Sequence, residues 1–278
     1  TGAAIIGLLE PPGRIAGGEI LLEGQRIDQL GHEAMRHIRG RKIGAIFQDP
    51  LTSLNPLYTV GHQLVETIQA HLPVNAAEAR TRAISLLRDT GISAPEQRID
   101  HYPHQFSGGM RQRVVIALAL AAEPKLIVAD EPTTALDVSI QAQIIALLKK
   151  VCQQHGAAVM LITHDMGVIA ETCDRVAVLY AGRIAEIGPV HEVINQPAHP
   201  YTAGLMAAIP DMTQDRERLN QIDGAMPRLN AIPKGCAYNP RCPQTFERCR
   251  NERPDLMPAG ATRAACWLHE PSGRRSAA

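Results

Sequence analysis

Short apolar runs that end in polar residues alternate along this chain with segments of helical spacing. The apolar runs are Leu126–Ala129, Val159–Thr163 and Val176–Tyr180, and the helical segments are Met110–Ala122, Ser139–His155 and Gly167–Cys173. A strand, a crossover helix and a second strand of the same sheet form a parallel unit. Aromatic residues make up only 3% of the chain, so the core consists of Ala, Ile, Leu and Val, as in parallel strands buried under helices. The sequence therefore predicts an α/β fold with a parallel sheet.

Length and charge narrow the class of protein. With 278 residues, the chain can form one large α/β domain and a smaller appendage. The formal net charge is +0, so electrostatics give no reason to expect a nucleic-acid partner. The apolar runs all fall short of the ~20 residues that a membrane helix needs, and we expect a chain that does not span a bilayer.

The composition changes twice along the chain. Residues 59–98 show helical spacing and follow a Pro-punctuated loop, whereas Pro, Cys and Arg become frequent from Pro197 onward and the alternation stops. We expect a helical block within the α/β domain and a separate C-terminal domain.

Two acids, Asp130 and Glu131, follow the apolar strand Leu126–Ala129. Ligands of open α/β sheets bind at the carboxyl ends of such strands. Alone, an acid pair of this kind is more often a turn and a helix cap. In a phosphate-transfer site, the first acid can hold Mg²⁺ and the second can polarise the attacking water.

A Ser-Gly-Gly sequence, Ser107 to Gly109, opens the helix after the helical block. Backbone N–H groups at such a helix start attract phosphate, although a Ser cap followed by flexible glycines is the simpler reading of these three residues alone. Gln48 and His164 also follow strands, and a lone His there is usually a hydrogen-bonded structural residue.

The order of these features along the chain favours the functional reading. They are Gln48, Ser107–Gly109, Asp130–Glu131, Ala135–Asp137 and His164, each at a strand end or a helix start. This pattern resembles the ATP-binding cassette (ABC) ATPases from Thr1 to about Gly188, which implies a P-loop NTPase fold with a RecA-like parallel sheet. One position departs from it: Met110 stands where many members carry Gln.

The resemblance implies a role for each matching residue. Gln48 is the Q-loop residue, which touches Mg²⁺ and the membrane partner. Asp130 ends the Walker B strand, and its carboxylate holds Mg²⁺. Glu131 is the general base, and His164 contacts the γ-phosphate. Ser107, Gly108 and Gly109 form the signature that grips the ATP of the opposite subunit, and Asp137 lies in the adjoining D-loop.

Three further stretches resemble the ATPase subunits of bacterial dipeptide and oligopeptide importers, whose relatives also carry nickel or glutathione. They are Gln48–Pro56, His199–Leu205 and Gly235–Pro243. The resemblance implies a pair of ATPases, the same or different, beneath two transmembrane permeases at the cytoplasmic face of the bacterial inner membrane. A solute-binding protein feeds the permeases, and nucleic acid is not a partner. The implied domains are an ATPase core of residues 1–48 and 126–190, a helical subdomain of 49–125 and a Cys-rich domain of 195–278.

Four cysteines crowd the C-terminal region with the spacing C-x5-C-x6-C-x16-C: Cys236, Cys242, Cys249 and Cys266. The sequence shows no export signal, so a metal or cluster site is favoured over disulfides. Four thiolates can hold zinc or a [4Fe–4S] cluster. The family resemblance favours the cluster with a structural role; zinc is the alternative, and four free thiols come third.

The phosphate-binding loop G-x-x-x-x-G-K-[ST] occurs nowhere in the sequence. The resemblance places that loop just before the helix in which Thr1 lies, so we expect the record to be truncated at its start and the chain as given to bind ATP very poorly. An alternative hypothesis is a non-hydrolysing paralogue whose signature completes a partner's ATP site. A cassette ATPase of nucleic-acid repair is disfavoured, because the chain has no basic stripe.

Overall fold

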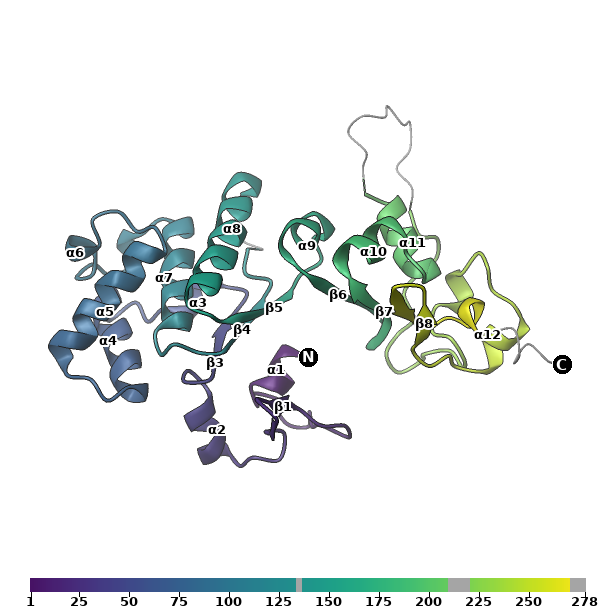
Figure 1. Ribbon diagram of the computed structural model, residues 1–278, viewed down its shortest axis with the longest axis horizontal. Coiled ribbons are helices and arrows are strands. Elements are labelled where there is room, and N and C mark those ends of the chain that lie inside the picture. The colour runs from purple at the N-terminus through teal and green to yellow at the C-terminus, as the bar shows by residue number, and fades with distance from the viewer. Residues whose placement is uncertain (134–136, 210–220, 271–278) are drawn as a thin grey trace. The chain divides into compact units, whose positions relative to one another are not determined.

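The computed structural model describes residues 1–133, 137–209 and 221–270 (Figure 1). The chain divides into two compact units, Thr1–His164 and Asp165–Ala278. No helix in these described ranges is both long and apolar enough to cross a membrane.

The first unit contains a parallel three-stranded sheet. Its strands are β3 (Ile43–Ile46), β4 (Leu126–Asp130) and β5 (Ala158–Ile162), in the order β3-β4-β5. Ile43 pairs with Leu126, and Leu126 pairs in turn with Ala158, so the three strands run in register and end at one edge. This confirms the predicted parallel sheet in this part of the chain.

Two short strands near the start of the chain form a small hairpin in the same unit. Strands β1 (Leu21–Leu22) and β2 (Gln25–Arg26) pair antiparallel. The two residues between them, Glu23 and Gly24, have φ of 51° and 77°. Such a pair of positive φ values is typical of a two-residue hairpin turn.

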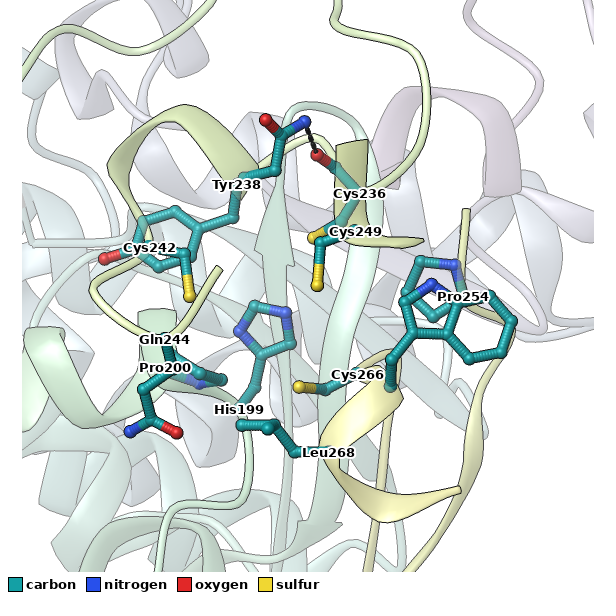
Figure 2. A pocket seen from close by; sticks show the side chains of 12 residues that line it. His199, Pro200, Cys236, Tyr238, Cys242, Gln244, Cys249, Pro254, Cys266 and Leu268 are labelled. Carbon is teal, nitrogen blue, oxygen red and sulfur yellow. Dashed lines mark hydrogen bonds between the residues drawn. The ribbon is translucent and has the colours of Figure 1, made fainter. Parts of the chain in front are cut away.

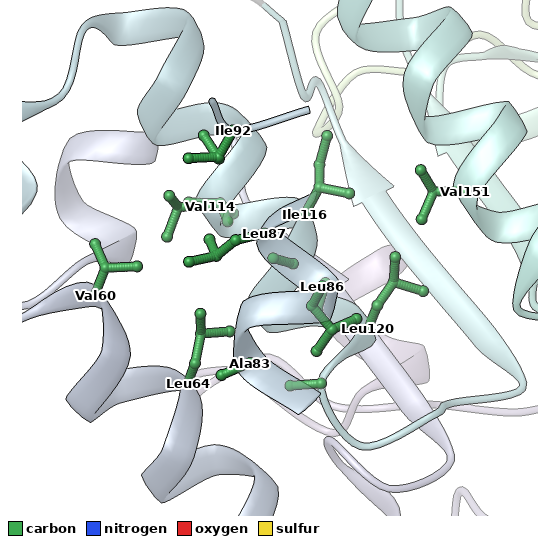
Figure 3. Close-up of a cluster of buried hydrophobic side chains, with 14 of the residues drawn as sticks. Val60, Leu64, Ala83, Leu86, Leu87, Ile92, Val114, Ile116, Leu120 and Val151 are labelled. Carbon is green, nitrogen blue, oxygen red and sulfur yellow. The ribbon is translucent and has the colours of Figure 1, made fainter. Parts of the chain in front are cut away.

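The helical block predicted for residues 59–98 is confirmed as a set of helices that share one core. The helices of the first unit are α1 (Gly2–Ile5), α2 (His32–Ile38), α3 (Pro50–Ser53), α4 (Val60–His71), α5 (Ala76–Asp89), α6 (Pro95–Arg98), η1 (Pro103–Gln105), α7 (Gly108–Leu120) and α8 (Val138–Gln154). The side chains of Leu64, Leu87 and Ile116, from α4, α5 and α7, are fully buried and point toward one another (Figure 3). Burying a Leu or Ile side chain contributes about 1.5–3 kcal/mol, so this cluster holds the helices together.

Three of these helices begin at side-chain caps that the sequence supplies. The side chains of Thr59, Asn75 and Ser107 accept hydrogen bonds from the backbone N–H three residues ahead. Such caps satisfy a donor that the helix leaves without a partner, which fixes where each helix starts.

The second unit contains a four-stranded antiparallel sheet in the order β6-β7-β9-β8. The strands are β6 (Arg175–Tyr180), β7 (Arg183–Pro189), β8 (Met257–Ala259) and β9 (Thr262–Ala264), and the helices are α9 (Met166–Thr172), α10 (Val190–Asn195), α11 (Pro200–Ala207), η2 (Asn239–Arg241), α12 (Glu247–Asn251) and η3 (Trp267–His269). The last two β-strands therefore come from the Cys-rich region: β9 pairs with β7, and β8 pairs with β9.

The expectation that Val176–Tyr180 continues the parallel sheet is wrong. This strand, β6, pairs antiparallel with β7. The reason is the two-residue turn between them, in which Ala181 and Gly182 have φ of 46° and 77°. That turn reverses the chain at once, so β7 runs antiparallel along β6, and the sheet of the second unit is built on this pair.

Candidate functional site

Glu131 lies at the carboxyl edge of the parallel sheet, directly after β4. Its backbone N–H donates to Ile162 O at 2.8 Å, which ties it to the end of β5. Its φ is +46°, a left-handed conformation that a non-glycine residue adopts at a cost of about 1–3 kcal/mol. A strained conformation of this kind persists only where the surrounding structure fixes the residue. The backbone bond to Ile162 O therefore keeps Glu131 in one place at the sheet edge.

The Glu131 carboxylate accepts two side-chain hydrogen bonds from the neighbouring strand ends. Gln48 Nε2, which follows β3, donates to Oε2 at 2.8 Å. His164 Nδ1, which follows β5, lies 3.2 Å from Oε1. Three residues predicted from separate parts of the sequence thus meet at one edge, and we call Gln48, Glu131 and His164 the carboxylate triad.

The triad is open to solvent on the His164 side. The His164 side chain is 78% exposed, whereas that of Glu131 is 29% exposed. The Glu131 carboxylate is thus partly accessible to water, and a carboxylate in such a position can accept a proton from a bound water molecule.

Asp130 is the last residue of β4 and provides further oxygen ligands at the same edge. A Cβ added to Gly2 would lie 3.9 Å from Asp130 Oδ2, so helix α1 begins beside this carboxylate. Because Gln48 uses its amide nitrogen to donate to Glu131, its Oε1 is left as the acceptor. Carboxylate and amide oxygens are the donors that Mg²⁺ takes, so the chemistry of Asp130 and Gln48 fits this ion.

The predicted signature residues lie at the start of α7, away from the triad. Ser107 Oγ accepts the Met110 N–H at 3.4 Å, and Ser107 and Gly108 are exposed. A Cβ on Gly109 would lie 3.1 Å from Ile140 Cγ2, so a side chain there would crowd α8. This helix start presents backbone N–H groups to solvent, the geometry that binds an anion.

Asp137 begins α8 and is exposed. Its side chain makes no cap hydrogen bond to the helix, and its backbone oxygen accepts from Ile140 and Gln141. Residues 135 and 136 of the same predicted stretch lie outside the described residues.

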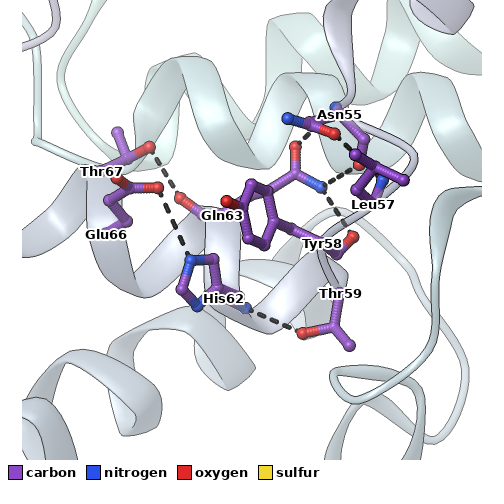
Figure 4. Close-up of polar contacts among 8 residues, drawn as sticks. All are labelled: Asn55, Leu57, Tyr58, Thr59, His62, Gln63, Glu66 and Thr67. Atoms are coloured by element: carbon purple, nitrogen blue, oxygen red, sulfur yellow. Dashed lines mark hydrogen bonds and ion pairs between the residues drawn. The ribbon is translucent and has the colours of Figure 1, made fainter.

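An exposed aromatic and aliphatic surface follows Gln48 in the sequence, and no motif pointed to it. Leu57 is 79% exposed, and the ring of Tyr58 stacks on His62 with centroids 4.6 Å apart (Figure 4). The side chain of Gln63 fixes this loop: its Oε1 accepts the Asn55 N–H at 2.9 Å, and its Nε2 donates to Asn55 O at 3.0 Å. The only available signal was an apolar Leu-Tyr pair in a polar loop.

The four predicted cysteines line one cavity of about 20 Å³ in the second unit, together with His199 (Figure 2). Burial raises the pKa of Cys236, Cys242 and Cys266, the last to about 11. All four are free thiols, so the donor chemistry fits a thiolate-bound metal or cluster. Their positions do not form such a site, however, since the described residues contain no group of three or more His, Cys, Asp or Glu side chains placed to hold a metal ion.

A buried carboxylate that sequence reasoning missed supports one side of this cavity. Glu186 is fully buried, and its two oxygens accept the N–H groups of Ala198 and His199, both at 2.9 Å. Burial lowers the pKa of His199 to about 4, so this ring is neutral, and its Nδ1 accepts the Tyr201 N–H at 3.0 Å. In the sequence, the signal for this buried carboxylate was that Glu186 is a lone acid in the otherwise apolar stretch Ile184–Pro189.

A second missed residue, Arg248, joins the segments that carry Cys249 and Cys266. Its guanidinium lies over the Trp267 ring at 3.7 Å from the centroid. It also pairs with Glu252 at 2.7 Å and with Glu270. A cation over an aromatic face and two carboxylates fix this wall of the cavity.

Known proteins resemble this chain over nearly its whole length. Residues 2–134 match the ABC transporter family, and residues 185–249 match the family described as oligopeptide/dipeptide transporter, C-terminal region. The dipeptide transport ATP-binding protein DppD of Escherichia coli is 47% identical over 264 residues, which cover 95% of this chain and 81% of that protein. The chain belongs to the ABC transporter ATPases. A second relative of this ABC ATPase, the oligopeptide transport ATP-binding protein AppD of Bacillus subtilis, is 43% identical over 98% of this chain and 84% of its own.

Solved structures share the cassette fold with this ABC ATPase. A dimeric structure of the ATP-binding cassette MJ0796 bound to ADP and Pi is 32% identical with a TM-score of 0.56, covering 64% of this chain and 75% of that one. The cbiO1 protein of Clostridium perfringens, part of an ABC transporter complex, is 29% identical with a TM-score of 0.60 over 70% of this chain and 73% of its own. The predicted ABC cassette fold, with its parallel sheet, is therefore confirmed.

Proposed function

We propose that this ABC ATPase is the ATP-hydrolysing subunit of an importer of dipeptides or oligopeptides, at the cytoplasmic face of the bacterial inner membrane. The carboxylate triad carries the proposal, because Gln48 and His164 hold Glu131 at the edge where a water can reach it. The names of the curated relatives, which are dipeptide and oligopeptide transport ATP-binding proteins, support the solute class. Nickel and glutathione are the alternative solutes.

In this mechanism Glu131 Oε1 or Oε2 takes the proton of the attacking water. The hydrogen bonds from Gln48 and His164 orient the carboxylate toward the water that it activates. Asp130 and Gln48 Oε1 would hold Mg²⁺, and the ion would supply positive charge to the phosphate groups. His164, which is exposed, contacts the γ-phosphate.

The second half of the ATP site comes from another subunit. Ser107, Gly108 and Gly109 grip the ATP that lies on the opposite ATPase, and Asp137 lies at the same interface. Support comes from the exposed helix start of α7, where Ser107 and Gly108 face solvent. The active form is then a dimer of two ATPases, the same or different.

Glu131→Gln tests the catalytic role in a complete protein that carries the phosphate-binding loop, assembled into the transporter with its partner subunits. The loss of a general base should slow peptide-stimulated ATP turnover by roughly 10²–10⁴-fold while ATP binding persists. Glu123→Gln is the matched control, because Glu123 is an exposed carboxylate whose side chain pairs with Arg82 at 3.1 Å. Equal turnover in the Glu131→Gln and Glu123→Gln transporters would show that another group activates the water.

Two transmembrane permeases are the proposed partners of the surface formed by Leu57, Tyr58 and His62. This surface follows Gln48 in the sequence, and Gln63 holds it in place. An exposed Leu beside an aromatic stack is typical of a protein contact. Leu57→Asp should therefore reduce the amount of permease that purifies with the ATPase, and a solute-binding protein would reach the complex only through the permeases.

For the C-terminal cavity we propose a [4Fe–4S] cluster held by Cys236, Cys242, Cys249 and Cys266, with zinc as the alternative. The support is that all four thiols, from separate segments, line one enclosed space. The cluster would have a structural role, because it would link the segments of the Cys-rich domain that carry the four cysteines.

Anaerobic purification tests the cluster. Broad absorbance near 400 nm with about four iron atoms per chain is the expected result, and it should disappear in Cys242→Ser. Cys173→Ser is the control, because Cys173 does not line the cavity. Stoichiometric zinc without the absorbance band would establish the alternative.

A further inference from the structure

The second unit contains a groove that none of these proposals uses. It has a volume of about 380 Å³, within the range of about 300–1,000 Å³ that is usual for small-molecule sites. Its apolar lining includes Tyr180 and Tyr238, which are only 5% and 3% exposed, and the side chain of Leu256. The rings of these two tyrosines lie edge to face at 5.3 Å, so they form a fixed aromatic wall rather than a mobile surface.

Three charged side chains line the same groove. Arg183 comes from β7, while Arg253 and Asp255 flank the buried residue Pro254. Within residues 1–133, 137–209 and 221–270, none of the three charged groups makes a hydrogen bond or an ion pair. Arg248, by contrast, is fully engaged by two carboxylates and a Trp ring. The groove therefore combines an apolar wall with two available cations and one available anion.

We propose that this groove binds a small zwitterion with an apolar side chain: a short peptide or a free apolar amino acid. The guanidinium groups of Arg183 and Arg253 receive the carboxylate, for which their planar donors are suited. Asp255 receives the ammonium group, and the apolar side chain packs on Tyr180 and Tyr238. Because the groove has two arginines and one aspartate, the carboxylate of the ligand makes the strongest contact.

The site is distinct from the proposed ATP site and does not depend on ATP hydrolysis. It shares four lining residues with the cysteine cavity: His199, Cys236, Tyr238 and Pro254. A bound zwitterion thus contacts the wall of the cavity that carries one of its thiols.

Calorimetric titration of the full chain with the dipeptide Phe-Leu, its C-terminal amide, its N-acetyl form, free Phe and acetate tests the proposal. Phe-Leu or Phe should bind, and the better of the two identifies the natural source. Amidation should weaken binding about 10-fold or more, because it replaces ion pairs with two arginines by a neutral contact. Acetylation should weaken binding by less, because the ammonium group faces a single carboxylate.

Variants identify the groups that bind. Arg183→Gln with Arg253→Gln should weaken binding of the free carboxylate form about 10-fold or more and leave the amide form unchanged. Asp255→Asn should reduce the preference for the free amine over the acetylated form. Arg175→Gln is the matched control, because Arg175 is an exposed arginine of β6 that does not line the groove. No detectable heat at millimolar ligand, equal binding of acetate and Phe-Leu, or unchanged binding in the double variant would each overturn the proposal.

Discussion

Glu186 offers the sharpest test of how the second unit is held together. Its buried carboxylate accepts the N–H groups of Ala198 and His199 and also the Thr262 hydroxyl at 3.1 Å. It thereby fixes the chain just before α11 to strands β7 and β9. Replacing Glu186 with Leu keeps a side chain of similar size but removes every acceptor.

The cost follows from the groups left without a partner. The Thr262 hydroxyl can turn to Ala259 O, which already lies at 3.1 Å, so it loses little. The two backbone N–H groups have no such alternative in the observed arrangement, and a buried unsatisfied amide costs about 1–3 kcal/mol. Because Ala198 is only half-buried, we expect Glu186→Leu to lower the free energy of unfolding by about 3 kcal/mol.

Glu186→Gln is the graded variant. A glutamine keeps one acceptor oxygen, but its NH₂ group must face one of the donors. We therefore expect a loss of about 1–3 kcal/mol, smaller than that for Leu. The surface variant Glu192→Gln is the control, because Glu192 pairs only with the exposed His191, at 3.2 Å.

Urea unfolding followed by tryptophan fluorescence measures these differences. The chain has a single Trp, Trp267, and it lies in the same unit as Glu186, so the signal reports this unit alone. With a slope of about 2 kcal/mol per molar urea, a loss of about 3 kcal/mol lowers the midpoint by about 1.5 M. A Glu186→Leu midpoint that matches that of Glu192→Gln would refute the reasoning that this carboxylate satisfies buried donors.

Two other predictions concern the first unit. A Cβ on Gly44 would lie 2.3 Å from Ala119 O, so Gly44→Ala should destabilise the unit by about 1–3 kcal/mol or more. Gly17→Ala is the control and should be neutral, because the space around Gly17 is open. Thermal unfolding followed by circular dichroism measures both, and equal stability of the two variants would contradict the packing argument. Burial raises the pKa of the Cys152 thiol to about 11, so at pH 8 iodoacetamide should label it roughly 100-fold more slowly than an exposed thiol, with the rate rising as the pH approaches 11. Mass spectrometry of the peptides measures this rate, and rapid labelling of Cys152 at pH 8 would contradict the burial.

Much of the first unit could be predicted because its signals are local. Apolar runs predicted β4 and β5 to within one residue at each end, and capping side chains such as Ser107 marked where helices begin. The order of motifs gave the family, which the comparisons show. The domain boundaries and the role of each site residue remain predictions.

The errors and omissions arose where distant residues decide the outcome. The strand at Val176–Tyr180 has the same apolar pattern whether its neighbour is parallel or antiparallel, and only the pairing with β7 distinguished them. Glu186 and Gln63 carry no motif, since their roles depend on backbone groups that folding brings to them.

By itself, the sequence determined which residues stand at strand ends and helix starts, because propensity, capping and apolar periodicity act over a few neighbouring positions. Only the tertiary structure decided which of them meet. Gln48 and Glu131 are 83 positions apart, and they form a 2.8 Å hydrogen bond because parallel strands end at a common edge. The four cysteines likewise share a cavity, and the charged groove exists, only because strands from the C-terminal region join β7. Contacts of this kind depend on the packing of whole elements, which local sequence does not specify.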